Sequence, residues 1–266
     1  MNQSNSQTKE TILKLKPFSL EMLNPSTKRA FQAGRNFSAG CKCVVIGKAN
    51  TGKSTLIKSI MYAKKHIFPV ALVMSGSENT NHFYETFVPK TFIHNEYDEE
   101  VIEKFVKRQK IAMEHLPNPW AILLIDDCTD EPKVFRRPLQ NNLYKVGRHY
   151  AMLYILSLQY AIDIRPSIRV NVDVCFILRE PSIKIRKSIW ENYASIIPDF
   201  AMFCDIMDQL DEYMALVIKN DSTSNKMEDC VFYYKAPIVP KDFKFGSKEY
   251  WQFHNDRFNP EFKDSY

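Results

Sequence analysis

Residues 47–54 read Gly47-Lys48-Ala49-Asn50-Thr51-Gly52-Lys53-Ser54, so that two glycines bracket four residues and are followed by Lys-Ser. An apolar run at 43–46 precedes this stretch and predicts a buried strand, while residues 55–65 have the composition of a helix. A strand, a glycine-rich loop and a helix in this order are the context in which the pattern binds phosphate. The glycines let the backbone approach phosphate oxygens, and the start of the helix adds the positive end of its dipole. The sequence therefore predicts a nucleoside triphosphate site.

The residue types of this loop suggest separate tasks at that site. Lys53 would contact the β- and γ-phosphates, and the hydroxyl of Ser54 would bind Mg²⁺. The other expected contacts to the nucleotide come from Gly47, Lys48, Ala49, Asn50, Thr51, Gly52 and Thr55.

Another buried strand, predicted at 120–125, ends in two adjacent carboxylates, Asp126 and Asp127. Asp126 would hold Mg²⁺, directly or through a water molecule, and Asp127 would take a proton from the attacking water as a general base. In the P-loop proteins that hydrolyse ATP for mechanical work, the second acid supplies this base. GTPases and nucleotide kinases generally lack it. The pair therefore predicts hydrolysis of ATP with Mg²⁺ as cofactor.

A further strand, predicted at 152–158, ends in Gln159. A polar amide at the carboxyl end of a central strand can contact the γ-phosphate or its water. We therefore predict that Gln159 senses hydrolysis.

Apolar runs alternate with amphipathic segments along most of the chain, which predicts an α/β fold with a mostly parallel sheet and helices on both faces. The remaining expected strands are 70–74 and 172–178, and the expected helices are 99–116, 134–150 and 182–196. Runs at 213–219 and 230–235, joined by a polar turn, predict an antiparallel hairpin at the sheet edge. We expect an N-terminal tail and edge segment at 1–37, a P-loop ATPase domain at 38–240 and a C-terminal tail at 241–266.

Composition is typical of a globular protein with a sizeable core, because apolar residues make up 45% and aromatic residues 13% of the 266 residues. The net charge of +5 permits contact with nucleic acid without demanding it. Among six cysteines only Cys41 and Cys43 form a close pair, without the further ligands of a zinc site, so we expect reduced, structural thiols in an intracellular protein. We expect neither a signal peptide nor a membrane span.

Together these features resemble the additional-strand ATPases of the FtsK–HerA superfamily, which have a RecA-like sheet. Within that superfamily the chain is similar to the genome-packaging ATPases of nucleocytoplasmic large DNA viruses, the poxvirus-type packaging family. The matching features are residues 47–54, 122–127, Gly147-Arg148-His149, the strand that ends at Gln159 and the segment 165–173. Asp127 departs from the wider superfamily, in which a glutamate is common at this position.

The resemblance implies an ATP-driven motor that moves double-stranded viral DNA into the capsid during virion assembly, without sequence specificity. It also implies a homo-oligomeric ring, expected to be a hexamer, and a capsid or membrane protein as partner at the packaging site. The expected location is the host cytoplasm, in the viral factory, or the virion.

Ring ATPases of this type use an arginine from a neighbouring subunit to stabilise charge on the transferring phosphoryl group. We expect Arg148 in this catalytic role, with Arg165, Arg169 and Arg179 as further candidates. Contact with DNA phosphates would come from basic clusters at 104–110, 136–137 and 184–187.

Three alternatives are open at this stage. A RecA-like or helicase-type recombination or repair ATPase would carry further helicase motifs or an added nucleic-acid domain. A nucleotide kinase would carry an arginine-rich lid. An ATP-binding assembly factor without motor activity would need no base such as Asp127, so it would be indifferent to a substitution there.

Overall fold

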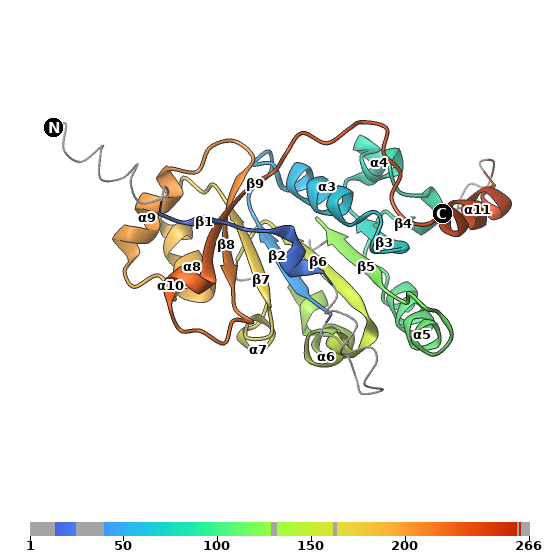
Figure 1. Ribbon diagram of the computed structural model, residues 1–266, viewed down its shortest axis with the longest axis horizontal. Helices are drawn as coiled ribbons and strands as arrows, with labels where there is room; N and C mark the ends of the chain where they lie inside the picture. Colours follow the sequence, from blue (N-terminus) through green and yellow to red (C-terminus); the bar gives the residue numbers. More distant parts are fainter. Residues whose placement is uncertain (1–13, 25–39, 129–131, 162–163, 260, 262–266) are drawn as a thin grey trace.

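The computed structural model describes residues 14–24, 40–128, 132–161, 164–259 and 261. These residues fold around a nine-stranded sheet with the order β1-β9-β8-β7-β2-β6-β5-β3-β4 (Figure 1). Neighbours run parallel from β7 across to β4, whereas β8 is antiparallel to both β7 and β9, and β1 is parallel to β9. The strands are β1 (Lys16–Pro17), β2 (Lys42–Ile46), β3 (Val70–Ser75), β4 (Ile93–His94), β5 (Ala121–Asp126), β6 (Met152–Leu158), β7 (Val174–Leu178), β8 (Met214–Lys219) and β9 (Val231–Lys235).

The order of the central strands sets the fold class. β6 lies between β2, which leads into the glycine-rich loop, and β5, which ends in Asp126. It is the additional strand that the family resemblance implies. The predicted α/β fold, with a mostly parallel RecA-like sheet, is thereby confirmed.

Helices cover both faces of the sheet (Figure 1). One face carries α3 (Lys53–Lys64) and α11 (Lys248–Arg257), and the other carries α5 (Glu99–His115), α6 (Pro138–Val146), α7 (Pro166–Arg169), α8 (Ile183–Tyr193) and α9 (Phe200–Asp208). Shorter helical segments connect them: η1 (Leu20–Leu23), α4 (Glu78–Asn81), η2 (Tyr84–Thr86), η3 (Lys90–Phe92), η4 (Pro132–Arg136), η5 (Gly147–Tyr150) and α10 (Met227–Cys230). Of the described helices, none is long and apolar enough to cross a membrane.

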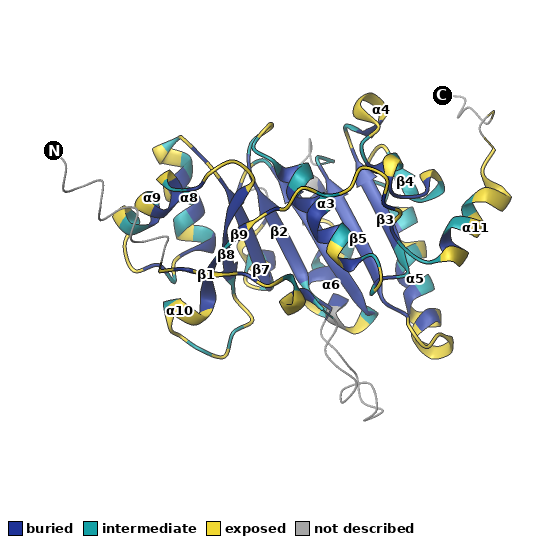
Figure 2. Ribbon diagram, turned by 45° about the horizontal axis from the view of Figure 1, so that its top comes forward, coloured by how far each residue is buried: buried dark blue, intermediate teal, exposed yellow. Residues whose placement is uncertain are grey.

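Side-chain alternation along the strands explains why they read as continuous apolar runs. In β2, Val44 and Ile46 pack with the α5 face, whereas Cys43 and Val45 pack with the α3 face, and each is at most 1% exposed. A strand buried on both faces needs apolar residues at every position. The burial of the central strands is visible in Figure 2, where the solvent-facing sides of the helices are exposed.

The stretch 134–150, predicted as helical, is helical, although not as a single element. The chain forms η4, then α6, then η5 across this stretch. Pro138 is the first residue of α6. Proline lacks the N–H that a helix interior requires, but the first turn of a helix tolerates it, so Pro138 starts a helix and does not continue one.

The predicted hairpin is present as β8 and β9, and it differs from the expectation in two details. The connection contains α10 as well as the polar turn, and β1 pairs with β9 on its outer side.

The C-terminal region is packed against the rest of the protein over most of its length. The hydroxyl of Tyr250, in α11, donates to the carbonyl oxygen of Ala71 at 2.5 Å, and the N–H of Phe245 donates to the carbonyl oxygen of Phe87 at 2.8 Å. Both Phe245 and Tyr250 are buried. The segment predicted as a tail from residue 241 therefore contributes to the core, while the predicted domain boundaries stay a prediction.

Candidate functional site

Parallel strands bring their carboxyl ends to one edge of the sheet, where ligands bind in folds of this type. The ends of β2, β5, β6 and β7 meet there, and the antiparallel β8 begins there. A cavity of about 670 Å³ opens at this edge. It is lined by Lys48, Ala49, Asn50, Thr51, Gly52, Lys53, Ser54, Thr55, Ser77, Asp126, Asp127, Arg179, Asp211, Glu212 and Tyr213.

The loop between β2 and α3 has the conformation of a phosphate cradle. Asn50 and Gly52 have positive φ angles of 62° and 97°, which turn successive N–H groups inward. A Cβ atom at Gly47 would lie 2.6 Å from Oγ1 of Thr51, so only glycine fits this close turn. No described side chain caps the start of α3 at Gly52. The first N–H groups of the helix are therefore available to an anion.

Lys53 lies at the centre of the cradle. Its Nζ donates to the carbonyl oxygen of Gly47 at 2.7 Å, and the residue is buried. Burial lowers the pKa of Lys53, and the charges of Asp127 and Asp126 oppose that effect. The ammonium group is therefore held against the loop, where it would help to bind phosphate.

Asp126 is 3% exposed at the end of β5. The hydroxyl of Tyr84 donates to its Oδ2 at 2.6 Å, whereas its Oδ1 has no hydrogen-bond partner among the described residues. Burial raises the pKa of Asp126, and the hydroxyls of Ser157 and Tyr84 together with the charge of Lys53 act in the opposite direction. Tyr84 thus fixes one carboxylate oxygen of Asp126, while the other makes no hydrogen bond of good geometry with the described residues.

Tyr84 was not identified from the sequence, because its contact with Asp126 arises only in the fold. The segment that carries it is fixed by the buried carboxylate of Glu78, which accepts the N–H groups of Tyr84 and Glu85 at 3.0 and 2.8 Å. A signal was present in the sequence, because Glu78 and Tyr84 lie six residues apart just after β3, the strand that pairs with β5.

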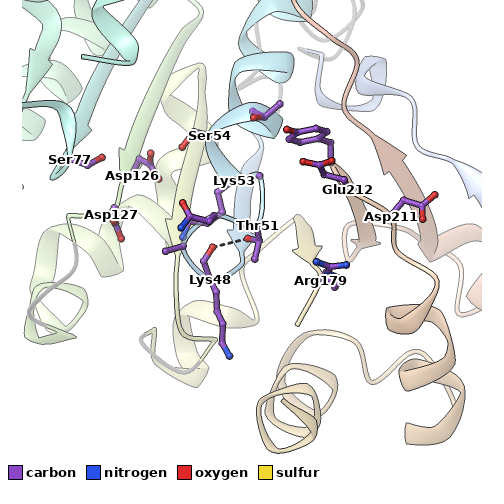
Figure 3. A pocket seen from close by; sticks show the side chains of 15 residues that line it. Lys48, Thr51, Lys53, Ser54, Ser77, Asp126, Asp127, Arg179, Asp211 and Glu212 are labelled. Carbon is purple, nitrogen blue, oxygen red and sulfur yellow. Dashed lines mark hydrogen bonds between the residues drawn. The ribbon is translucent and has the colours of Figure 1, made fainter. Parts of the chain in front are cut away.

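Asp127 and Gln159, predicted as base and sensor, are in contact. Nε2 of Gln159 donates to Oδ1 of Asp127 at 2.5 Å. Asp127 has a positive φ of 54°, an uncommon conformation for a residue with a side chain. Figure 3 shows Asp126 and Asp127 on one side of Lys53, both at the cavity. The structure therefore brings together the loop, the paired acids and Gln159.

Arg148, predicted to act on the nucleotide of a neighbouring subunit, stays a prediction. It belongs to η5, which precedes β6, so its backbone lies at the edge of the sheet opposite the cavity. Its side chain lies outside the described residues. Arg179, at the end of β7, does line the cavity, whereas Arg169 donates to the carbonyl oxygen of Ile164 at 2.6 Å.

Four other residues of the cavity were not identified from the sequence: Ser77, Asp211, Glu212 and Tyr213. Nor was the ion pair between Lys48 and the buried Glu180, whose Nζ–Oε1 distance is 2.9 Å. This pair ties the phosphate loop to the segment that follows β7.

No protein-family model matches the chain. Among curated proteins, "Uncharacterized protein 088R" of Invertebrate iridescent virus 3 is 47% identical, with 91% of this chain and 93% of that protein covered. "Uncharacterized protein 075L" of Invertebrate iridescent virus 6 is also 47% identical, with 93% and 96% covered.

Solved structures share the fold at low sequence identity. The genome packaging NTPase B204 from Sulfolobus turreted icosahedral virus 2, in complex with ATP-gammaS, is 18% identical, with a TM-score of 0.52 and coverage of 75% of this chain and 98% of that chain. The pCW3 conjugation coupling protein TcpA, with ATPgS, is 12% identical, with a TM-score of 0.52 and coverage of 91% and 73%. The fold is that of the P-loop NTPases, and the chain belongs to the family of the iridescent virus proteins 088R and 075L.

Proposed function

We propose that this protein is an ATP-driven motor that translocates double-stranded viral DNA into the capsid during virion assembly. The observation that carries the proposal is the hydrogen bond between Gln159 and Asp127 beside the phosphate loop. A passive nucleotide site needs neither a placed base nor an amide that contacts it. The similarity of the fold to that of the genome packaging NTPase B204 supports the DNA cargo.

The residues at the cavity fit a Mg²⁺ ion bound with the nucleotide. Oδ1 of Asp126 is buried without a described partner, and Ser54 lines the same cavity. Carboxylate and hydroxyl oxygens are the ligands that Mg²⁺ prefers, usually together with phosphate oxygens. When bound there, the ion would neutralise charge that develops on the phosphates.

The chain's own groups would then divide the work of hydrolysis. The backbone N–H groups of the loop and Nζ of Lys53 hold the phosphates in place. Gln159 fixes one carboxylate oxygen of Asp127, and the other oxygen accepts the proton of the attacking water. When the γ-phosphate leaves, the surroundings of Asp127 change. The hydrogen bond from Gln159 to Asp127 would carry that change to β6, which Gln159 directly follows.

The proposed motor would act as a homo-oligomeric ring, expected to be a hexamer, with a capsid or membrane protein as its partner at the packaging site. Because Arg148 lies at the sheet edge opposite its own cavity, it would act only on the nucleotide of a neighbouring subunit. Arg179 is the alternative donor, acting within its own subunit.

The basic clusters differ in how available they are to DNA. Arg186 is 5% exposed and pairs with Asp208 at 2.7 Å, and Arg137 pairs with Glu99 at 2.9 Å. Lys107 and Lys110, both exposed on α5, are therefore better candidates for phosphate contact.

The test is ATP hydrolysis by the full chain with and without linear duplex DNA. We expect hydrolysis that duplex DNA stimulates several-fold, together with displacement of a third strand from a triplex substrate. Unwinding of the duplex would instead favour the helicase alternative. An absence of any hydrolysis, with or without DNA, would contradict the motor.

Tyr84→Phe tests the orientation of Asp126. The substitution keeps the ring and removes the hydroxyl that donates to Oδ2, so the pKa of Asp126 should rise further. Because a protonated Asp126 cannot hold Mg²⁺, the acid limb of the pH–rate profile should move to higher pH. The Mg²⁺ concentration for half-maximal hydrolysis should rise about 10- to 100-fold.

Tyr234→Phe is the matched control. It removes another buried tyrosine hydroxyl, which contacts Oγ of Ser59 at 3.0 Å and not the cavity. An identical response of both variants would mean that Tyr84 has only a structural role.

A further inference from the structure

The cavity has two chemically different ends (Figure 3). Asp126 and Asp127 occupy one end, Lys53 and the loop lie in the middle, and Asp211 and Glu212 occupy the other end. The loop cradles the phosphates, and the paired acids manage the metal and the water beside the terminal phosphate. The nucleoside must therefore extend toward the opposite end.

The reversed direction of β8 places an aromatic residue at that end. β8 starts at Met214 and runs antiparallel to β7, so the residue before it, Tyr213, lies at the same edge as the loop. A Cβ atom built on Gly52 would be 3.1 Å from Cδ1 of Tyr213, which places the ring directly beside the phosphate cradle.

Tyr213 has two features that packing does not account for. The residue is 39% exposed, in contrast to the buried tyrosines of the core, and its φ is +60°. A bulky residue in the left-handed region is a strained choice, since glycine adopts it without cost. Tyr213 thus places an aromatic ring at a position where the turn alone would favour glycine.

The two acids beside the ring fit a nucleoside and not a phosphate. Among the described residues, neither Asp211 nor Glu212 takes part in an ion pair with a basic residue, although Arg179 lines the same cavity. Carboxylates repel phosphate, but they accept hydrogen bonds from ribose hydroxyls and from base amino groups. Glu212 also raises the pKa of the Tyr213 hydroxyl, through a hydrogen bond and through its negative charge.

We propose that Tyr213 is the surface on which the nucleobase stacks, with Asp211 and Glu212 accepting hydrogen bonds from the nucleoside. This inference extends the proposed function and depends on only one part of it, namely that the cavity binds a nucleotide. It assigns the part of the cavity that distinguishes a nucleotide from a bare polyphosphate.

The test compares a non-hydrolysable ATP analogue with inorganic tripolyphosphate, each with Mg²⁺, by titration calorimetry on the full chain. Replacing an aromatic side chain on which a base stacks by alanine lowers affinity by about 5- to 150-fold. Tyr213→Ala should therefore weaken binding of the analogue at least about fivefold and leave tripolyphosphate binding unchanged. Tyr213→Phe should retain the wild-type values, and Tyr213→Leu, which keeps an apolar side chain without a ring, should behave like Tyr213→Ala.

Glu212→Gln separates the role of the acid. It should weaken the analogue less than Tyr213→Ala does, again without an effect on tripolyphosphate. Unchanged affinity for the analogue in both Tyr213→Ala and Tyr213→Leu would overturn the inference, as would equal wild-type affinity for the two ligands. A different result would be a protein that shows no DNA-stimulated hydrolysis and still binds the ATP analogue more tightly than tripolyphosphate. That result would refute the motor and leave the inference about Tyr213 standing.

Discussion

Replacing Lys53 by alanine is expected to abolish ATP hydrolysis, with a fall in kcat of about 100- to 1,000-fold or more. Nζ of Lys53 is held at 2.7 Å from the carbonyl oxygen of Gly47, inside the cradle, so the variant loses a fixed positive charge where negative charge develops. The measurement is steady-state phosphate release at saturating Mg²⁺ and ATP, with nucleotide affinity determined in parallel.

Lys65→Ala is the control for this variant. Lys65 lies at the other end of α3, with its Nζ 3.8 Å from the centre of the Tyr62 ring, and its loss removes the same charge far from the cavity. Hydrolysis by Lys53→Ala at the wild-type rate would show that the loop does not bind the reacting phosphates.

Asp127→Asn is expected to bind ATP with wild-type affinity and to stall with the nucleotide intact. General-base catalysis contributes about 10²- to 10⁴-fold, and an amide cannot accept the proton of the attacking water. The amide oxygen of asparagine can still accept the hydrogen bond from Gln159, so the local structure is preserved. A single-turnover experiment, which follows bound ATP and ADP over time, measures the effect.

Asp126→Asn provides the contrast, because it removes the charge of the residue with the free Oδ1. This variant should lose Mg²⁺-dependent nucleotide affinity, whereas Asp127→Asn should not. If Asp127→Asn hydrolysed ATP normally, the protein would not use this base, and an assembly factor that switches shape would fit better.

Much of the fold follows from local sequence patterns. The strands that flank the loop are buried on both faces, and such strands are visible as short apolar runs, as at Val44 and Ile46. The loop itself is recognisable because its chemistry permits few residue types. Asp126, Asp127 and Gln159 were found because they lie at the carboxyl ends of two predicted strands of a parallel sheet.

The features that were missed depend on contacts between distant parts of the chain. Tyr84 meets Asp126 across 42 positions, and Tyr213 meets the loop only because β8 runs in reverse. The burial of Arg186 has the same origin, because a basic cluster in sequence gives no sign of which member pairs with Asp208. The break at Pro138 was a local signal, and it was overlooked in favour of the longer amphipathic pattern.

The sheet described above ends at both sides in strands of only two residues, β1 and β4. Pro17 lies in β1, and proline has no N–H to offer a further strand. Within the described part of the chain, neither border is a template on which another copy could extend the sheet. Subunits of the proposed ring would therefore meet through side chains and loops. An interface of this kind can open and close once per nucleotide without breaking backbone hydrogen bonds between strands, as a motor that steps along DNA requires.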